Sequence, residues 1–90
     1  MPRIVVVEDD PRQAELVRAY LRNDGHSVVV VHDGRAALDE VRRRQPDAVV
    51  LDVMLPKLDG FDVCRVLRAE HPGVAVVLVT ARASEDDLLL

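Results

Sequence analysis

Residues 47–60 read DAVVLDVMLPKLDG. The apolar run at residues 48–51 is short and unbroken, and it stops at Asp52. Such runs are typical of strands that are buried on both faces in a parallel sheet. Pro56 and Gly60 then mark a turn before the next apolar pattern, although Gly60 can equally serve only as a permissive backbone position. This stretch predicts a central parallel strand with an aspartate at its carboxyl end.

Three more runs of this kind surround that strand, at residues 4–7, 28–31 and 74–79. The segments between them repeat apolar residues at helical spacing and predict helices at residues 11–23, 34–44 and about 59–70. A fourth helix is expected to begin at Ser84 and to continue to Leu90. Strands that alternate with helices predict right-handed crossovers and a doubly wound α/β fold, in which helices cover both faces of one parallel sheet.

The composition fits one globular domain over residues 1–90, with 49% hydrophobic and 31% charged residues. The net charge of −4 argues against a nucleic-acid surface in this segment, and the basic run at residues 42–44 is predicted to complement a helix dipole. Cys64 is the only cysteine, which excludes an internal disulfide and fits a reducing cytoplasm. No apolar stretch approaches the roughly 20 residues that span a bilayer, so no membrane contact is expected.

Polar residues follow the strands at the edge where α/β sheets bind ligands. Glu8, Asp9 and Asp10 follow the first strand, Asp52 follows the third, and Thr80 follows the fourth. Ligands bind outside the carboxyl ends of the strands, where the strand order reverses. If the strands are ordered 2-1-3-4, the first and third are neighbours at the reversal, and their acids share one crevice.

Crowded carboxylates need a neutralising partner. Two carboxylates about 4 Å apart repel each other by roughly 4 kcal/mol at the effective dielectric of a protein surface. Asp10 is explained as a helix N-cap, which leaves Glu8, Asp9 and Asp52. Each acid alone is most simply a solvated loop residue, but their joint placement favours a site for a hard divalent cation, with Mg²⁺ the best candidate.

The sequence resembles the receiver domains of two-component response regulators. The resemblance rests on VVVEDD at residues 5–10, on the stretch at 47–60, and on VVLVTA at residues 76–81, and it extends from Ile4 to Leu90. It implies a flavodoxin-like receiver fold with strand order 2-1-3-4. The middle block, D-x-M-L-P-x-x-D-G after an apolar strand, is the most specific of the three.

The resemblance also implies a set of site residues. Asp52 would be the phosphoacceptor, which takes a phosphoryl group from a phosphohistidine on a sensor histidine kinase. Asp9, Asp52 and the backbone carbonyl of Met54 would coordinate Mg²⁺, and Glu8 would help through a water molecule. The Thr80 hydroxyl would turn toward the phosphoryl group, and Ala81 would leave room there. The domain is therefore expected to be a self-phosphorylating acceptor and not a free-standing enzyme.

The chain is shorter than the pattern it resembles. It ends within the expected fourth helix and lacks the fifth strand, the fifth helix and the lysine that follows that strand, so Asp52 is expected to be phosphorylated weakly or not at all. The run at 74–79 then becomes a hydrophobic edge strand, which is prone to pair with another chain. This edge and Leu88, Leu89 and Leu90 predict a homodimer or a higher oligomer.

Other functions fit the sequence less well. A phosphatase of the haloacid dehalogenase type needs a second acid two residues after the nucleophile, where this chain has Met54. A nucleotide- or flavin-binding module would need a glycine-rich phosphate loop, and no such motif occurs. His26, His32 and His71 are interpreted as surface residues. A receiver-like interaction or oligomerisation module that is never phosphorylated stays open as the alternative.

The output of the parent protein is a separate question. The M-L-P-x-x-D-G wording resembles regulators in which the receiver precedes a winged-helix DNA-binding domain. This resemblance implies transcription regulation in the parent protein, with DNA contacted only through an output domain that these 90 residues do not include.

Overall fold

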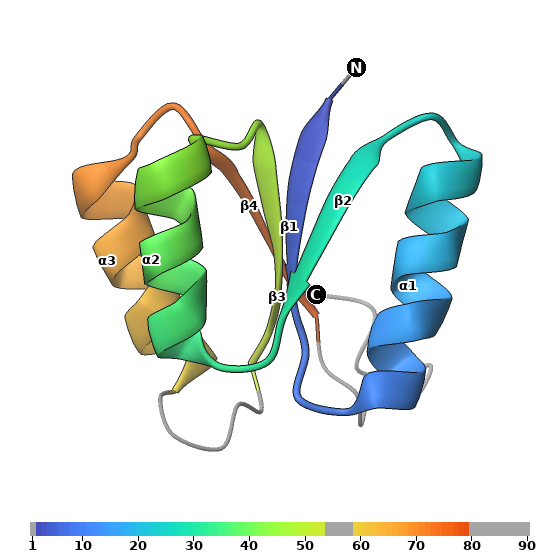
Figure 1. The fold of residues 1–90 in the computed structure, drawn as a ribbon. Coiled ribbons are helices and arrows are strands. Elements are labelled where there is room, and N and C mark those ends of the chain that lie inside the picture. The colour runs from blue at the N-terminus through green and yellow to red at the C-terminus, as the bar shows by residue number, and fades with distance from the viewer. Residues whose placement is uncertain (1, 54–58, 80–90) are drawn as a thin grey trace.

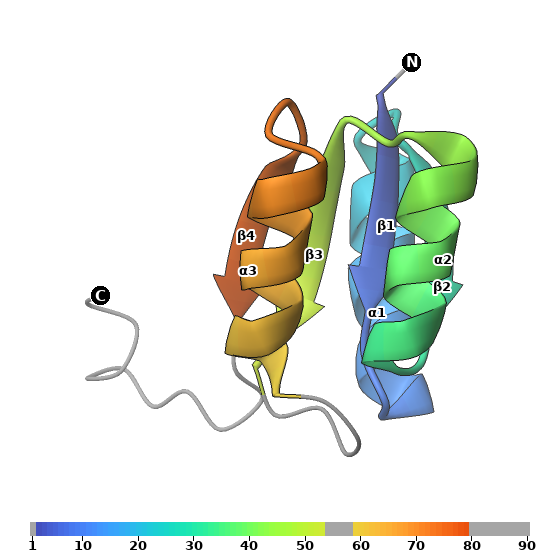
Figure 2. The same cartoon turned by 90° about the vertical axis from the view of Figure 1, so that its left-hand side faces the viewer.

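The computed structural model describes residues 2–53 and 59–79. Strands and helices alternate along this part of the chain, as Figures 1 and 2 show. The elements are β1 (Arg3–Val7), α1 (Pro11–Asn23), β2 (Ser27–Val31), α2 (Gly34–Arg44), β3 (Ala48–Asp52), α3 (Gly60–Glu70) and β4 (Ala75–Val79). The expected helix from Ser84 and the leucines at 88–90 lie outside the described residues.

The sheet has the predicted topology. Its four strands are parallel and ordered β2-β1-β3-β4, which confirms the doubly wound arrangement. The helices α2 and α3 cover one face and α1 covers the other (Figure 1). Because β1 and β3 are neighbours and their next strands lie on opposite sides, the strand order reverses between them. The pairing of Val7 with Leu51 brings the carboxyl ends of these two strands to the same level.

The main core lies between the sheet and the pair α2 and α3. Its residues are aliphatic, and Cys64 packs against them as one of the partly buried neighbours. Each fully buried aliphatic side chain contributes roughly 1.5–3 kcal/mol relative to an exposed one, so this face fixes the register of the strands. The cluster comprises Val5, Val7, Ala37, Val41, Val49, Leu51, Val63, Leu67 and Val74.

An aspartate caps the start of each of the three described helices. The side chain of Asp10 accepts a hydrogen bond from the Arg12 amide, and Asp33 and Asp59 cap α2 and α3 in the same manner. These caps satisfy amides that have no partner within the helix. They also fix where α1 and α3 begin, beside the carboxyl ends of β1 and β3.

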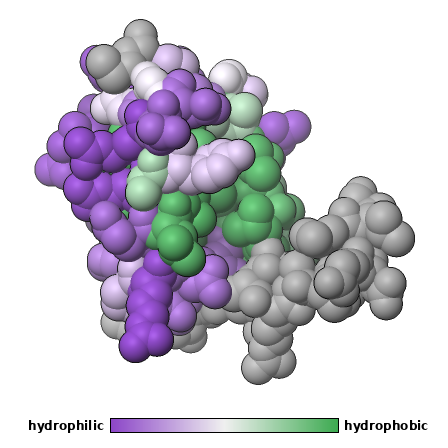
Figure 3. Space-filling view, turned by 90° about the vertical axis from the view of Figure 1, so that its right-hand side faces the viewer, coloured by the Kyte–Doolittle hydropathy of each residue, from purple (hydrophilic) through white to green (hydrophobic). Residues whose placement is uncertain are grey.

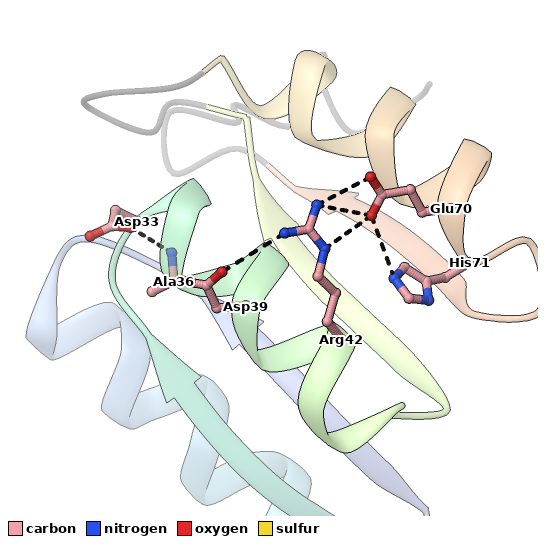
Figure 4. Close-up of polar contacts among 6 residues, drawn as sticks. All are labelled: Asp33, Ala36, Asp39, Arg42, Glu70 and His71. Carbon is pink, nitrogen blue, oxygen red and sulfur yellow. Dashed lines mark hydrogen bonds and ion pairs between the residues drawn. The ribbon is translucent and has the colours of Figure 1, made fainter.

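The basic run at residues 42–44 forms ion pairs at the end of α2. Arg42 donates to both carboxylate oxygens of Glu70 on α3 at 3.0–3.1 Å, as Figure 4 shows. Arg43 and Arg44 bind Glu40, whose side chain is only 7% exposed. The hydrogen bond from Arg43, together with Arg44, holds the pKa of Glu40 below its ordinary value. Arg42 thus joins α2 to α3, and Arg43 and Arg44 neutralise the buried Glu40, in addition to any interaction of the three arginines with the helix dipole.

The strand β4 is poorly covered in the part of the chain that the structure describes. Val77, Leu78 and Val79 are 50%, 38% and 40% exposed. Figure 3, which views the molecule from the side of α1, shows apolar surface open to solvent. Among the described residues, no helix is both long and apolar enough to cross a membrane.

Candidate metal and phosphoacceptor site

Three carboxylates meet at the carboxyl ends of β1 and β3. Glu8 and Asp9 follow β1 directly, and Asp52 is the last residue of β3. One oxygen from each lies within 4.8 Å of the others. Asp52 is 1% exposed and Glu8 is 6% exposed, whereas Asp9 is exposed. The predicted convergence of these acids at the sheet reversal is thus present in the fold.

Backbone hydrogen bonds hold the two ends of this site. The Glu8 amide donates to the Val31 carbonyl of β2 at 3.0 Å, and the Val53 amide donates to the Val79 carbonyl of β4 at 2.9 Å. The Glu8 side chain accepts a hydrogen bond from the Asp10 amide at 3.2 Å. The neighbouring strands on either side therefore position the acids at the carboxyl ends of β1 and β3.

Burial and the neighbouring acids change the protonation of Glu8. Together they raise the pKa of Glu8 from 4.5 to about 7: burial is the largest cause, the carboxyls of Asp52 and Asp9 act in the same direction, and the hydrogen bond from the Asp10 amide opposes them. A carboxyl beside like charges keeps its proton because ionisation would add another negative charge. The site therefore binds a proton at pH values where an ordinary glutamate is ionised.

The donor set fits a hard divalent cation. Carboxylate oxygens are the ligands that such ions prefer, and a cation would offset the like charges of Asp52 and Asp9 that, after burial, help to raise the pKa of Glu8. The carboxyl oxygen of Glu8 lies within the same 4.8 Å cluster as those of Asp9 and Asp52. Its expected role through a water molecule stays a prediction.

Gly60 has a role that the sequence interpretation left open. A Cβ atom at this position would lie 2.5 Å from the Val53 Cα and 2.7 Å from the Asp52 carbonyl oxygen. The Gly60 amide also donates to the Val53 carbonyl at 3.3 Å. The first turn of α3 thus packs directly on the backbone of Asp52 and Val53, and only glycine allows this approach.

Other predicted site residues have different outcomes. Met54, Thr80 and Ala81 lie outside the described residues. His32 is exposed, as predicted, but its ring nitrogen Nδ1 lies 3.0 Å from the backbone carbonyl oxygen of Glu8. The prediction that His71 is a plain surface residue is wrong in part, because its Nε2 atom is buried near Glu70.

The sequence model of the response regulator receiver domain family matches residues 4–89. The chain therefore belongs to this family, and it is a receiver domain of the two-component response regulators. The fold and the acidic cluster described above agree with that assignment.

Among curated proteins, the chain is similar to DNA-binding response regulators of mycobacteria. It is 49% identical over 88 residues to the DNA-binding response regulator MtrA of Mycolicibacterium smegmatis, and the match covers 98% of this chain and 38% of that protein. It is 45% identical over 84 residues to the probable transcriptional regulatory protein TcrX of Mycobacterium tuberculosis, and the match covers 93% of this chain and 36% of that protein. The chain thus spans less than two fifths of the length of these relatives.

Solved receiver structures share the fold. The BeF3-activated N-terminal receiver domain of Klebsiella pneumoniae RstA is 41% identical with a TM-score of 0.84, and the match covers 97% of this chain and 74% of that one. The response regulator TrrA of Thermotoga maritima in complex with Mg(2+)-BeF is 30% identical with a TM-score of 0.88, and the match covers 92% of this chain and 72% of that one. A complex of TrrA with the histidine kinase ThkA matches with a TM-score of 0.87 and 30% identity, and the match covers 93% of this chain and 72% of that one.

The raised pKa of Glu8 predicts how the stability of the metal-free chain depends on pH. Below pH 4.5 the Glu8 carboxyl is protonated in both the folded and unfolded states, whereas between pH 4.5 and about 7 the unfolded state releases its proton first. The free energy of unfolding should therefore fall, by on the order of 2–3 kcal/mol from this group, as pH rises through that window. Urea unfolding in the presence of a chelator should show this component in the wild type and lose it in Glu8→Gln. Equal pH dependence in the two proteins would contradict the prediction, and Glu15→Gln on the exposed side of α1 is the control.

The close approach at Gly60 predicts a second effect. Gly60→Ala should lower the free energy of unfolding by about 1–3 kcal/mol, because the new methyl group must displace the Asp52–Val53 backbone. Gly73→Ala is a matched control, since a Cβ there meets nothing within 4 Å. Thermal unfolding of both variants tests the difference, and a Gly60→Ala variant as stable as Gly73→Ala would show that the contact is unimportant.

Proposed function

We propose that this domain accepts a phosphoryl group on Asp52 from a phosphohistidine of a sensor histidine kinase, in a reaction that requires Mg²⁺. The observation that carries the proposal is the convergence of Glu8, Asp9 and Asp52 at the reversal of the sheet. Such a cluster places a nucleophilic carboxylate beside the acids that can bind the cation. The solved complex of TrrA with the kinase ThkA supports the class of donor.

We propose that Asp9, Asp52 and the backbone carbonyl of Met54 hold Mg²⁺, with Glu8 assisting through a water molecule. The all-oxygen donor set of Glu8, Asp9 and Asp52 supports a hard cation. TrrA, which was solved with Mg(2+)-BeF, supports magnesium in particular. When bound, the ion offsets negative charge on the phosphoryl group during transfer.

The protein's own residues then do the chemistry and the positioning. A carboxylate oxygen of Asp52 forms a bond to phosphorus, the bond from phosphorus to the histidine nitrogen breaks, and the electron pair stays on the imidazole. The product is an acyl phosphate. We propose that the Thr80 hydroxyl donates a hydrogen bond to this group and that the small Ala81 side chain leaves room for it.

The output and the cellular setting are part of the same proposal. The relatives MtrA and TcrX are named as DNA-binding and transcriptional regulators, and the chain covers 38% and 36% of their lengths. We propose that the parent protein regulates transcription through a separate DNA-binding domain. The domain then acts as a switched acceptor in the cytoplasm, where the unpaired Cys64 stays reduced, and not as a free-standing enzyme.

A second copy of the chain is the partner that we propose for β4. This strand reads AVVLV, so it carries no charge or proline that would discourage pairing at its outer edge. Val77 and Val79 are 50% and 40% exposed. Two such edges are complementary to each other by symmetry, since the same uncharged strand would face itself across a twofold axis.

The phosphoacceptor assignment predicts the outcome of chemical phosphorylation. With a small acyl phosphate as donor and Mg²⁺ present, slow incorporation of one phosphoryl group should occur at Asp52, as mass spectrometry of peptides can locate. Asp52→Asn should lose the modification, whereas Asp39→Asn on the exposed surface of α2 should retain it. Modification that persists in Asp52→Asn would contradict the assignment. Its absence from the wild type would favour an interaction module that is never phosphorylated.

The β4 contact predicts concentration-dependent association. Val77→Lys should shift the chain toward monomer in sedimentation equilibrium, because a charge at the edge of the strand opposes pairing. Leu16→Lys changes an apolar side chain on α1 that is 71% exposed, and it should leave the association unchanged. A wild-type chain that stays monomeric at every concentration would overturn the proposal.

A further inference from the structure

We propose that His32 is a positioning residue for the metal site. Its ring donates a hydrogen bond to the backbone carbonyl of Glu8 and thereby fixes the peptide that leads into Asp9. The inference rests on the proposed function, because it assigns a role toward the cation that Glu8, Asp9 and Asp52 would hold.

The geometry defines the chemical state of the ring. The Nδ1 atom of His32 lies 3.0 Å from the Glu8 carbonyl oxygen. Since a carbonyl oxygen only accepts hydrogen bonds, Nδ1 must carry the hydrogen, and the neutral ring is then the tautomer with an unprotonated Nε2. The contact joins residues 24 positions apart in the sequence.

The sheet brings these two groups together. Val7 pairs with Val31, so Glu8 and His32 follow neighbouring strands at the same level. The Glu8 amide already donates to the Val31 carbonyl at 3.0 Å. With the His32 contact, both backbone polar groups of Glu8 are bound to the end of β2.

The carbonyl of Glu8 belongs to the same planar peptide as the amide of Asp9. The orientation of this plane sets the direction in which the backbone continues from β1 through Asp9. On the other side, Asp10 is fixed by its capping bond to Arg12 and by the bond from the Ala14 amide to its carbonyl at 2.9 Å. Asp9 is therefore an exposed acid between two anchored residues, and His32 supplies the anchor from β2.

This anchor opposes the repulsion within the site. Glu8, Asp9 and Asp52 are close enough to repel one another, and Asp9, which is the exposed member, has the most freedom to move away. A fixed peptide between Glu8 and Asp9 keeps the Asp9 carboxylate where the ion would bind. The contribution of one such hydrogen bond is modest, so its loss should weaken cation binding without abolishing it.

Mn²⁺ affinity, measured by electron paramagnetic resonance of the free ion, tests the proposal. His32→Ala should weaken Mn²⁺ binding about fivefold, and His32→Asn should restore it to within about twofold, because the asparagine Nδ2 occupies the position of Nδ1 and can donate to the same carbonyl. His26→Ala, at the opposite end of β2, should bind as the wild type does. Unchanged affinity in His32→Ala, or an asparagine variant as weak as the alanine variant, would overturn the role of His32.

The tautomer is a second readout, measured on the unmodified chain, so it does not depend on any variant folding. Long-range ¹H–¹⁵N NMR at mildly alkaline pH should show the hydrogen of the His32 ring on Nδ1, and finding it on Nε2 would overturn the inference. A wild-type chain that binds no Mn²⁺ contradicts the metal site itself, whereas binding that is indifferent to His32 contradicts only the positioning role.

Discussion

The mutual repulsion of three carboxylates is the constraint around which this fold is arranged. Glu8, Asp9 and Asp52 lie within 4.8 Å of one another, and two of them are buried. Burial, together with the nearby carboxyls of Asp52 and Asp9, raises the pKa of Glu8 to about 7. A cluster of this kind persists only when the surrounding backbone gives it no way to relax, and the same repulsion provides the affinity for a cation.

Backbone contacts from three directions hold the acids together. The register between β1 and β3 places the acids of the two strand ends side by side, and the aliphatic core under α2 and α3 stabilises that register. The first turn of α3 packs on Asp52 through Gly60, and β2 reaches the Glu8 backbone through Val31 and His32. The ion pair between Arg42 and Glu70 joins α2 to α3, the two helices that cover the core.

Much of this arrangement follows from local sequence patterns. The apolar runs gave the strands to within a residue or two, and Asp10, predicted as an N-cap, gave the start of α1, so the meeting of Asp9 and Asp52 could be predicted from topology. The contacts of Gly60 and His32 could not, because each depends on a backbone atom of another element. The roles of Met54, Thr80 and Ala81 stay predictions from the family resemblance.

The most direct test of the metal site is anomalous diffraction from crystals of the chain grown with Mn²⁺. We expect one strong manganese peak between the ends of β1 and β3, at bonding distance from carboxylate oxygens of both Asp9 and Asp52. Manganese bound only elsewhere on the molecule, or a refined site in which Asp9 and Asp52 turn away from each other, would contradict it.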